Sequence, residues 1–447
     1  PTWNGKMIEA KNLTLDDKVI GDDGTIRNIL GVTKGYGKMY EISQGRKGES
    51  YKVNDQHILT LHMPDHKVIF WNASKNGWSV LWWDHNTKTI KTKSESIDLS
   101  VANVNCEECG ISLSGHLKRH YTRMHKGLEV PIKQRKPPSK SPNTSEAIDA
   151  KNRLETFCKN IRNDNTIDIS VQDYLKLPKN TQLRLAGIRG DCVQWPHRDV
   201  TLDPYLLGLW LGDGSERGNG IACDEGIDPE TIEYLEQWCQ INEGRIKKVG
   251  PCNHYIASAG NTRYSHNFPN PLKEALSAYN LVNNKHIPKD YLVNDQDTRL
   301  KLLAGFVDSD GTVQRNGTRI SISQGMMHKD IIDGIVFLAR SLGLFCSVHI
   351  RKTTWTYKGQ KKEGKCYKIE ITGNIGNIPT RLPRKKCSDD KTHSSKTTGK
   401  ISVKETDDGD YVGITIDGNQ RFLINDFTVT HNCSAYSVRF EAVSYTH

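Results

Sequence analysis

Short runs of alternating apolar and polar residues fill both ends of the chain. Residues 1–62 contain three of them, in DDKVIGDDGTIRNIL, KMYEIS and SYKVNDQHILTL. Asp23-Gly24 lies between two apolar runs and is a tight-turn signal. Residues 405–433 return to the pattern with YVGITI, a turn at DGN, RFLI and FTVTHNC. A period of two is typical of half-buried strands, so we predict β-rich structure at both ends.

The segments between these ends change character several times. Residues 63–100 hold the aromatic runs VIFWN and WSVLWW, which predict strands. Residues 101–150 hold a Cys/His cluster and then KQRKPPSKSPNTSEA, whose Pro, Ser and Lys content predicts a linker that does not fold alone. Residues 151–200 look α/β.

An internal repeat marks residues 201–380. LLGLWLGDG (206–214) matches LAGFVDSDG (303–311) at an offset of 97 residues. A helical pattern follows each copy, DPETIEYLEQWCQI after the first and HKDIIDGIVFLARSLG after the second. A duplicated unit predicts two pseudo-symmetric halves around an approximate two-fold axis.

Length, cysteine content and charge narrow the class of protein. A chain of 447 residues exceeds one compact core, so two or three domains are expected. We find no apolar run of about 18 residues, and PTWNGKMIEA lacks a signal peptide's apolar stretch, so we expect an intracellular protein. Only Cys106 and Cys109 are closely spaced among eleven cysteines, which argues against a disulfide framework.

The net charge of +10 is concentrated in two segments. Residues 116–140 hold eight Lys/Arg against one acidic residue, and residues 381–404 hold eight against two. Such segments fit a polyanionic partner, although either one alone is equally well explained as a solvated loop.

Both repeat copies end in Asp-Gly. We expect Gly214 and Gly311 to cap their helices with a positive φ, which brings Asp213 and Asp310 together at the helix ends. Carboxylates there oppose the helix dipole, and a divalent cation compensates them. One Asp-Gly alone is a common turn pair, but two in matched context favour Mg²⁺ bound for phosphodiester hydrolysis.

LAGFVDSDG resembles the LAGLIDADG signature of homing endonucleases, and LLGLWLGDG resembles the first copy in intein-encoded members. KHIPKDYL (285–292) extends the likeness. The resemblance implies that Asp213 and Asp310 are catalytic and hold two or more Mg²⁺ ions. It also implies that Lys285 is a catalytic lysine whose symmetry mate in PRKKC is Lys386, with Lys385 as the alternative.

The implied partner is double-stranded DNA with a long target site, cut in both strands by a monomer with internal two-fold symmetry. Residues on the predicted strands are then candidates for reading the major groove: Arg245, Lys247, Arg319 and Gln324.

The Cys/His cluster has the spacing Cys106-x2-Cys109-x10-His120-x4-His125. Two thiolates on a turn and two imidazoles on a helix suit one tetrahedral Zn²⁺, although common fingers have about twelve residues in the spacer. His116 is an alternative ligand. Basic residues predict that the module contacts DNA, with a purely structural zinc knuckle as the alternative: Lys118, Arg119, Arg123 and Lys126.

The two β-rich ends resemble the halves of an intein splicing domain. Asn54 and His57 in NDQH match the motif that activates the upstream bond, and His431, Asn432 and Cys433 match the downstream junction. In that frame Asn432 cyclises, Cys433 begins the host segment and residues 434–447 are host-derived. Pro1 has no thiol or hydroxyl, so we expect incomplete splicing of this chain.

We therefore expect a protein of mixed α/β and all-β class: a β-rich Hint-type splicing domain interrupted by a pseudo-two-fold αββαββα LAGLIDADG endonuclease domain, with a small zinc-finger-like insert. The expected bounds are 1–62 and 396–433 for the splicing domain, 63–195 for a DNA-recognition insert and 196–395 for the endonuclease. The expected function is site-specific cleavage of DNA, in the nucleus or wherever the host gene resides. The alternatives are an autoprocessing intein with an inactive nuclease and a non-catalytic, zinc-containing DNA-binding protein.

Overall fold

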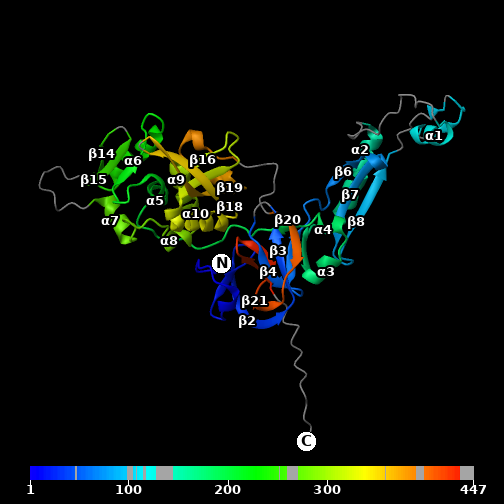
Figure 1. Cartoon of the computed structure of the whole chain (residues 1–447), viewed down its shortest axis with the longest axis horizontal. Coiled ribbons are helices and arrows are strands. Elements are labelled where there is room, and N and C mark those ends of the chain that lie inside the picture. The colour runs from blue at the N-terminus through cyan, green and yellow to red at the C-terminus, as the bar shows by residue number, and fades with distance from the viewer. Residues whose placement is uncertain are drawn as a thin grey trace, which may run out of the picture. The chain divides into compact units, whose positions relative to one another are not determined.

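The computed structural model describes residues 1–45, 48–97, 104–106, 108–113, 117–126, 144–250, 252–258, 270–357, 359–388 and 397–432 (Figure 1). The chain divides into two compact units. The first unit comprises residues 1–60, 168–175 and 186–447, and the second comprises residues 61–167 and 176–185. Among the described residues, no helix is long and apolar enough to cross a membrane.

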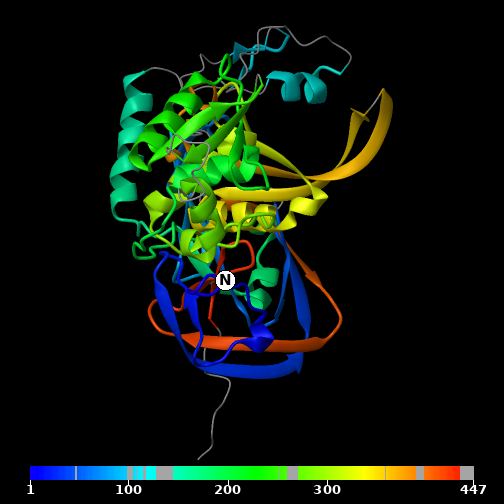
Figure 2. The ribbon, with the colours of Figure 1, turned by 90° about the vertical axis from the view of Figure 1, so that its left-hand side faces the viewer.

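The two ends of the sequence build one strand-rich domain within the first unit. β1 and β2 form a hairpin with Gly24 at φ +75°, so the tight turn predicted at Asp23-Gly24 is confirmed. β2 also pairs with β21 along most of its length, which joins the start of the chain to its end (Figure 2). The strands and short helices are β1 (Lys18–Ile20), β2 (Ile26–Gly37), β3 (Met39–Gln44), β4 (Tyr51–Asn54), β5 (Ile58–His62), β11 (Thr166–Ser170), β12 (Ala186–Ile188), β20 (Thr397–Glu405), β21 (Gly409–Ile416), β22 (Arg421–Ile424), β23 (Thr428–His431), η1 (Ala10–Asn12) and α3 (Val171–Lys176).

These strands form three sheets. A six-stranded sheet has the order β11-β5-β12-β20-β3-β4, a three-stranded sheet has the order β1-β2-β21, and β22 pairs with β23. Val19, Ile29, Ile414 and Ile416 form one small core beneath the three-stranded sheet. The β22–β23 hairpin brings Arg421 opposite His431, the last residue of β23.

The repeat-containing segment folds around two apolar helices, α5 (Pro204–Asp213) and α9 (Gln296–Asp310). Both helices start at a capping aspartate, because Asp203 accepts from the amides of Tyr205 (2.9 Å) and Leu206 (3.1 Å) and Asp295 accepts from Thr298 (2.8 Å). The elements that follow α5 are β13 (Gly220–Ala222), α6 (Pro229–Ile241), β14 (Gly244–Lys248), β15 (Asn253–Ser258), α7 (Pro271–Ala278) and α8 (Lys289–Leu292).

The elements that follow α9 are β16 (Gly311–Val313), β17 (Ile320–Gly325), η3 (Met326–His328), α10 (Lys329–Ser341), β18 (Phe345–Tyr357), β19 (Gln360–Thr372), η4 (Ile375–Asn377) and η5 (Pro383–Lys385). The helices predicted after each repeat copy are confirmed as α6 and α10. Each copy packs its helices on a small antiparallel sheet, β13-β15-β14 in the first and β16-β17-β19-β18 in the second. The β18–β19 hairpin extends as a long curved ribbon, yellow to orange in Figure 2.

The second unit contains the aromatic strands. The strands predicted from VIFWN and WSVLWW are confirmed as β6 (Ile69–Asn72) and β7 (Gly77–Asp84), which pair with each other and with β8 (Thr89–Ser96). Helix α2 (Ser145–Lys159) packs on this sheet through Leu154 and Cys158. The other elements are η2 (Ala73–Lys75), β9 (Val104–Asn105), β10 (Ser112–Leu113), α1 (Leu117–Met124) and α4 (Lys179–Gln182).

The predicted linker 133–147 ends earlier than its composition indicated. Residues 133–143 lie outside the described residues, but Thr144 caps α2 by accepting from the Ala147 amide at 3.3 Å. Residues 144–147 therefore form the cap and first turn of α2. Ala147 and Ala150 are the first buried residues of this helix.

Candidate functional site

Two glycines allow α5 and α9 to pack backbone against backbone. A Cβ added at Gly208 would lie 2.1 Å from the Leu302 carbonyl oxygen, and one at Gly305 would lie 2.0 Å from that of Tyr205. Near the C-terminal ends, a Cβ on Gly212 would lie 3.1 Å from Asp310 Oδ2. The contact therefore continues to the last turn of both helices, where Asp213 and Asp310 are located.

The glycines after the two aspartates cap the helices in a different way from the one predicted. Gly214 has φ −76° and ψ 149°, and Gly311 has φ −78° and ψ 146°, so the expected positive φ is wrong. The chain leaves each helix directly into extended backbone, since Gly311 begins β16 and Gly214 bridges to Ile221. Glycine is required for space: a Cβ would lie 2.2 Å from the Trp210 carbonyl oxygen at Gly214 and 2.6 Å from that of Val307 at Gly311.

A lysine side chain caps the C-terminal end of each helix. Lys285 Nζ donates to the carbonyls of Trp210 (3.0 Å), Leu211 (3.1 Å) and Gly214 (2.7 Å) at the end of α5. An ammonium group at this position offsets the negative end of the helix dipole beside Asp213.

At the end of α9 the same contacts are made by Lys385. Its Nζ donates to the carbonyls of Val307 (3.0 Å), Asp308 (2.6 Å) and Ser309 (2.8 Å). Lys385 is 4 % exposed and is the last residue of η5, whereas Lys386, the capping residue that follows, is exposed. Lys385, the alternative that the sequence left open, therefore occupies the position at α9 that Lys285 occupies at α5.

The electrostatics of the site follow from its partial burial. Burial, followed by the charge of Asp310, raises the pKa of Asp213 to about 6. Burial also raises the pKa of Asp310, against the opposing effect of Lys285 and Lys385. Burial lowers the pKa of Lys285 to about 8 and lowers that of Lys385. Two carboxylates that repel each other in a half-buried site are a suitable ligand set for a hard dication.

Two further side chains contact this site. Gln324, predicted to read DNA, donates its side-chain amide to Asp310 Oδ2. Asp308 Oδ2 accepts from the Tyr205 hydroxyl (2.7 Å) and the Arg381 amide (2.6 Å), which ties the segment before Lys385 to α9. Asp308 is buried beside Phe306 and Val307 in the repeat motif, and a carboxylate among apolar residues is the only sequence signal that points to it.

The other predicted DNA-reading residues lie on the surface of the repeat-containing domain. Arg245 and Lys247 are two positions apart on β14 and are both exposed, so they share one face of that strand. Arg319 is exposed in the turn that leads into β17.

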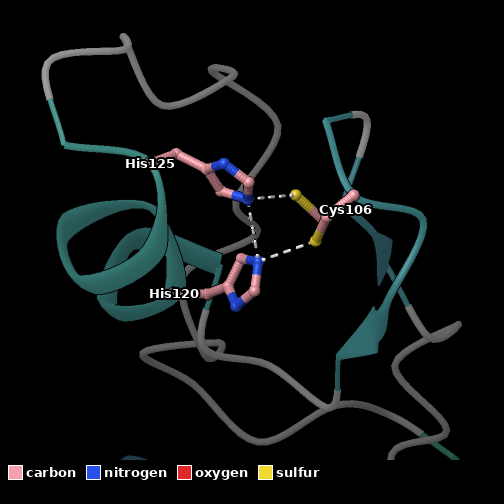
Figure 3. A group of neighbouring side chains, drawn as sticks. Cys106, His120 and His125 are labelled. Carbon is pink, nitrogen blue, oxygen red and sulfur yellow. Dashed lines mark hydrogen bonds between the residues drawn. The ribbon is translucent and has the colours of Figure 1, made fainter.

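The Cys/His cluster brings its four predicted ligands together, and Figure 3 shows three of them pointing at one another. Cys106 Sγ lies 3.4 Å from His125 Nε2, Cys109 Sγ lies 3.2 Å from His120 Nε2, and the two Nε2 atoms are 3.2 Å apart. All four ligand atoms lie within 4.8 Å of one another. Zn–S bonds of about 2.3 Å and Zn–N bonds of about 2.0 Å give tetrahedral edges of about 3.3–3.8 Å, so these separations suit zinc.

The residues around this cluster are described only in part. The alternative ligand His116 lies outside the described residues. Lys118 and Arg119 belong to α1, but their side chains are also outside the described set, whereas Arg123 and Lys126 are exposed. Tyr121 is buried beneath the two histidines and packs against both rings.

Three of the predicted splice residues, His57, His431 and Asn432, lie at the end of β23. His57 Nε2 lies 2.6 Å from the Thr430 hydroxyl oxygen, and His431 Nδ1 lies 2.9 Å from the Asn432 carbonyl oxygen. Burial, followed by the charge of His431, lowers the pKa of His57 to about 4. Asn54 ends β4, three residues before His57, and its carbonyl accepts from the His57 amide at 3.3 Å.

Asn432 is 2 % exposed, and its backbone N–H donates to the Gln420 carbonyl at 2.7 Å. Its side-chain Oδ1 is buried and has no hydrogen-bond partner among the described residues. Cys433 lies outside the described residues. The carbonyl that His431 contacts belongs to the peptide bond between Asn432 and residue 433.

Comparison with protein families gives two matches. The homing endonuclease model matches residues 286–400, and the model of the Hint domain associated with these enzymes matches residues 3–108. The first segment contains Asp310 and Lys385, and the second contains His57.

Comparison with characterised proteins agrees with these matches. The chain is 22 % identical over 484 aligned positions to the homothallic switching endonuclease of Saccharomyces cerevisiae, covering 96 % of this chain and 78 % of that protein. It is 22 % identical to the catalytic subunit of the V-type proton ATPase of Candida tropicalis, over 96 % of this chain but 42 % of that protein. It is 29 % identical over 172 positions to the replicative DNA helicase DnaB of Mycobacterium intracellulare, covering 38 % of this chain and 24 % of that protein.

Proposed function

We propose that the chain, which matches the homing endonuclease model and the model of its associated Hint domain, is an intein-type homing endonuclease that breaks both strands of DNA at a long, specific site with Mg²⁺. The observation that carries the proposal is the position of Asp213 and Asp310. Each ends a helix of the close-packed α5–α9 pair, and each helix end is closed by its own lysine.

The site fits a hard divalent cation. Asp213 and Asp310 supply carboxylate oxygens, the ligands that Mg²⁺ prefers, and their mutual repulsion is relieved by a dication. When bound, such ions activate water and stabilise the leaving oxygen of a phosphodiester. We assign one aspartate and one lysine to each half of a monomer with approximate two-fold symmetry, and one scissile phosphate to each half.

The residues of the chain itself position these groups. Lys285 and Lys385 fix the last turns of α5 and α9 and place positive charge beside the phosphates. Gln324 orients the Asp310 carboxylate through its amide hydrogen bond. Arg245, Lys247 and Arg319 are exposed on strands or turns and are assigned to the DNA interface.

We assign one Zn²⁺ to Cys106, Cys109, His120 and His125, on the strength of their mutual distances. With Arg123 and Lys126 exposed beside the site, the module is assigned to DNA binding. The place of action is the nucleus, or whichever compartment holds the target gene.

The test of the endonuclease is selection of cut sites from a randomised DNA library in Mg²⁺. The proposal predicts one long recovered sequence, cut in both strands, and no recovery in EDTA. Binding without cutting would favour a non-catalytic zinc-containing DNA-binding protein, and neither binding nor cutting would favour an intein with an inactive nuclease.

A second function is autoprocessing at the downstream junction, favoured by the contact of His431 with the Asn432 carbonyl. The Asn432 side-chain nitrogen attacks its own carbonyl carbon, the succinimide C–N bond forms, and the bond to residue 433 breaks. The leaving nitrogen takes up a proton and departs as an amine, while an Nδ1–H of His431 polarises the carbonyl. Mass spectrometry would detect loss of residues 433–447, and Asn432→Ala would retain them.

A further inference from the structure

The hydrogen bond between His57 and Thr430 joins two residues that are 373 positions apart in the sequence. His57 lies just before β5, and Thr430 lies in β23, two residues before Asn432. Nε2 and Oγ1 are 2.6 Å apart, and Thr430 is 1 % exposed. The histidine assigned to the upstream bond is thus attached to the strand that carries the downstream junction.

We propose that Thr430 is a positioning residue that holds His57 as the tautomer with its proton on Nδ1; the inference rests on the autoprocessing function proposed above. A neutral imidazole has one N–H donor and one acceptor nitrogen. Whichever role Nε2 takes with Thr430, Nδ1 takes the other.

The direction of this hydrogen bond follows from the burial of the hydroxyl. Among the described residues, the only hydrogen bond of the Thr430 hydroxyl is the one to His57. A buried O–H that points at no acceptor is costly, so the hydroxyl donates to Nε2. Nδ1 then carries the ring proton and becomes the donor available to a peptide group.

The environment of the ring supports a neutral tautomer. His57 is partly buried, and this burial, together with the neighbouring His431, lowers its pKa to about 4. The ring therefore carries a single proton near pH 7, and Thr430 determines which nitrogen holds it.

Thr428 provides a matched control on the same strand. It is also 1 % exposed and lies two residues away on the same face. Its hydroxyl donates to Asp426 Oδ1 at 2.6 Å and accepts from Gln44 Nε2 at 2.9 Å, so its partners do not include a histidine. Thr428→Val removes one buried hydroxyl from β23 as Thr430→Val does, without touching His57.

The experiment is two-dimensional ¹H–¹⁵N NMR of histidine-labelled full chain at pH 7, with His57 assigned by its loss in His57→Gln. In the wild type we expect His57 with Nδ1 protonated and Nε2 as acceptor. Thr430→Val should raise the fraction protonated at Nε2 at least tenfold, whereas Thr430→Ser and Thr428→Val should match the wild type. An Nε2-protonated wild type, or a Thr430→Val spectrum within twofold of it, overturns the proposal.

Release of residues 433–447 separates this inference from the autoprocessing itself. Thr430→Val and Thr428→Val are compared in the release assay, because only Thr430→Val removes the hydrogen bond to His57. An equal, tenfold loss of release in Thr430→Val and Thr428→Val would show a structural role only and overturn the proposal. If the wild type releases nothing, autoprocessing fails, while the NMR result still decides the tautomer.

Discussion

A comparison of Lys385→Met with Lys386→Met tests which of the two neighbouring lysines caps α9 beside the site. Lys385 Nζ donates to three carbonyls at the end of α9, at 3.0, 2.6 and 2.8 Å. Methionine keeps most of the stem but supplies no donor, so all three carbonyls lose this partner. Asp310 follows directly after them, at the last position of α9.

The expected loss of stability is about 3 kcal/mol. Each buried carbonyl that loses its partner costs about 1 kcal/mol or more, and hydrogen bonds to a charged group are stronger. The variant no longer buries a charged ammonium group, and the desolvation cost that it avoids offsets part of this loss. Lys386 is exposed, so Lys386→Met should change the stability by less than about 0.5 kcal/mol.

Urea unfolding and DNA cleavage measured on the same samples provide the assay. We expect Lys385→Met to lower the urea midpoint and to slow cleavage about 100-fold at a temperature where it remains folded, because small displacements of catalytic groups are costly. Lys386→Met should match the wild type in both measurements. If Lys386→Met were equally impaired, or if Lys385→Met behaved as wild type, the assignment of the second lysine would be refuted.

Three other predictions test separate parts of the structure. The raised pKa of Asp213 means that its carboxyl group binds a proton more tightly in the folded chain than in the unfolded chain. The stability that this proton contributes is present below about pH 3.8 and is lost as the pH rises through about 6. Urea unfolding without metal should show this loss in wild type and not in Asp213→Asn. Gly305→Ala, whose Cβ would lie 2.0 Å from a carbonyl oxygen, should destabilise by about 1–3 kcal/mol or more in thermal unfolding, whereas Gly226→Ala, with its nearest neighbour at 3.3 Å, should not. Cys106→Ser/Cys109→Ser should lose the zinc measured by elemental analysis, and unchanged zinc content would refute the assigned ligands.

The sequence predicts those parts of the site that a repeat or a spacing defines. Asp213 and Asp310 stand at matched positions in two copies of one motif, and the Cys/His cluster has a recognisable ligand spacing. These signals depend on short segments, where one helix or one turn fixes the geometry. The element types of α6, α10, β6 and β7 follow from periodicity for the same reason.

The remaining features depend on how distant segments meet. The choice between Lys385 and Lys386 depends on the register of the single turn η5, which loop alignment does not resolve. Gln324 reaches Asp310 only because β17 pairs with β16 so that Ile322 lies opposite Gly311. The hydrogen bond between His57 and Thr430 requires both ends of the chain to fold into one domain.

The caps at Gly214 and Gly311 were predicted with the wrong backbone for a similar reason. Isolated helices commonly end in a left-handed glycine, but here each helix passes directly into a strand or bridge of its own sheet. Tertiary pairing selects the extended conformation, and the close approach of the Trp210 and Val307 carbonyls explains why glycine is still needed.

The most direct test of the endonuclease assignment is cleavage of a plasmid carrying the selected target site by wild type, Asp213→Asn and Asp310→Asn in Mg²⁺. The assignment predicts that wild type linearises the plasmid and that each variant binds the site but cuts neither strand. Unchanged linearisation by either variant would contradict it.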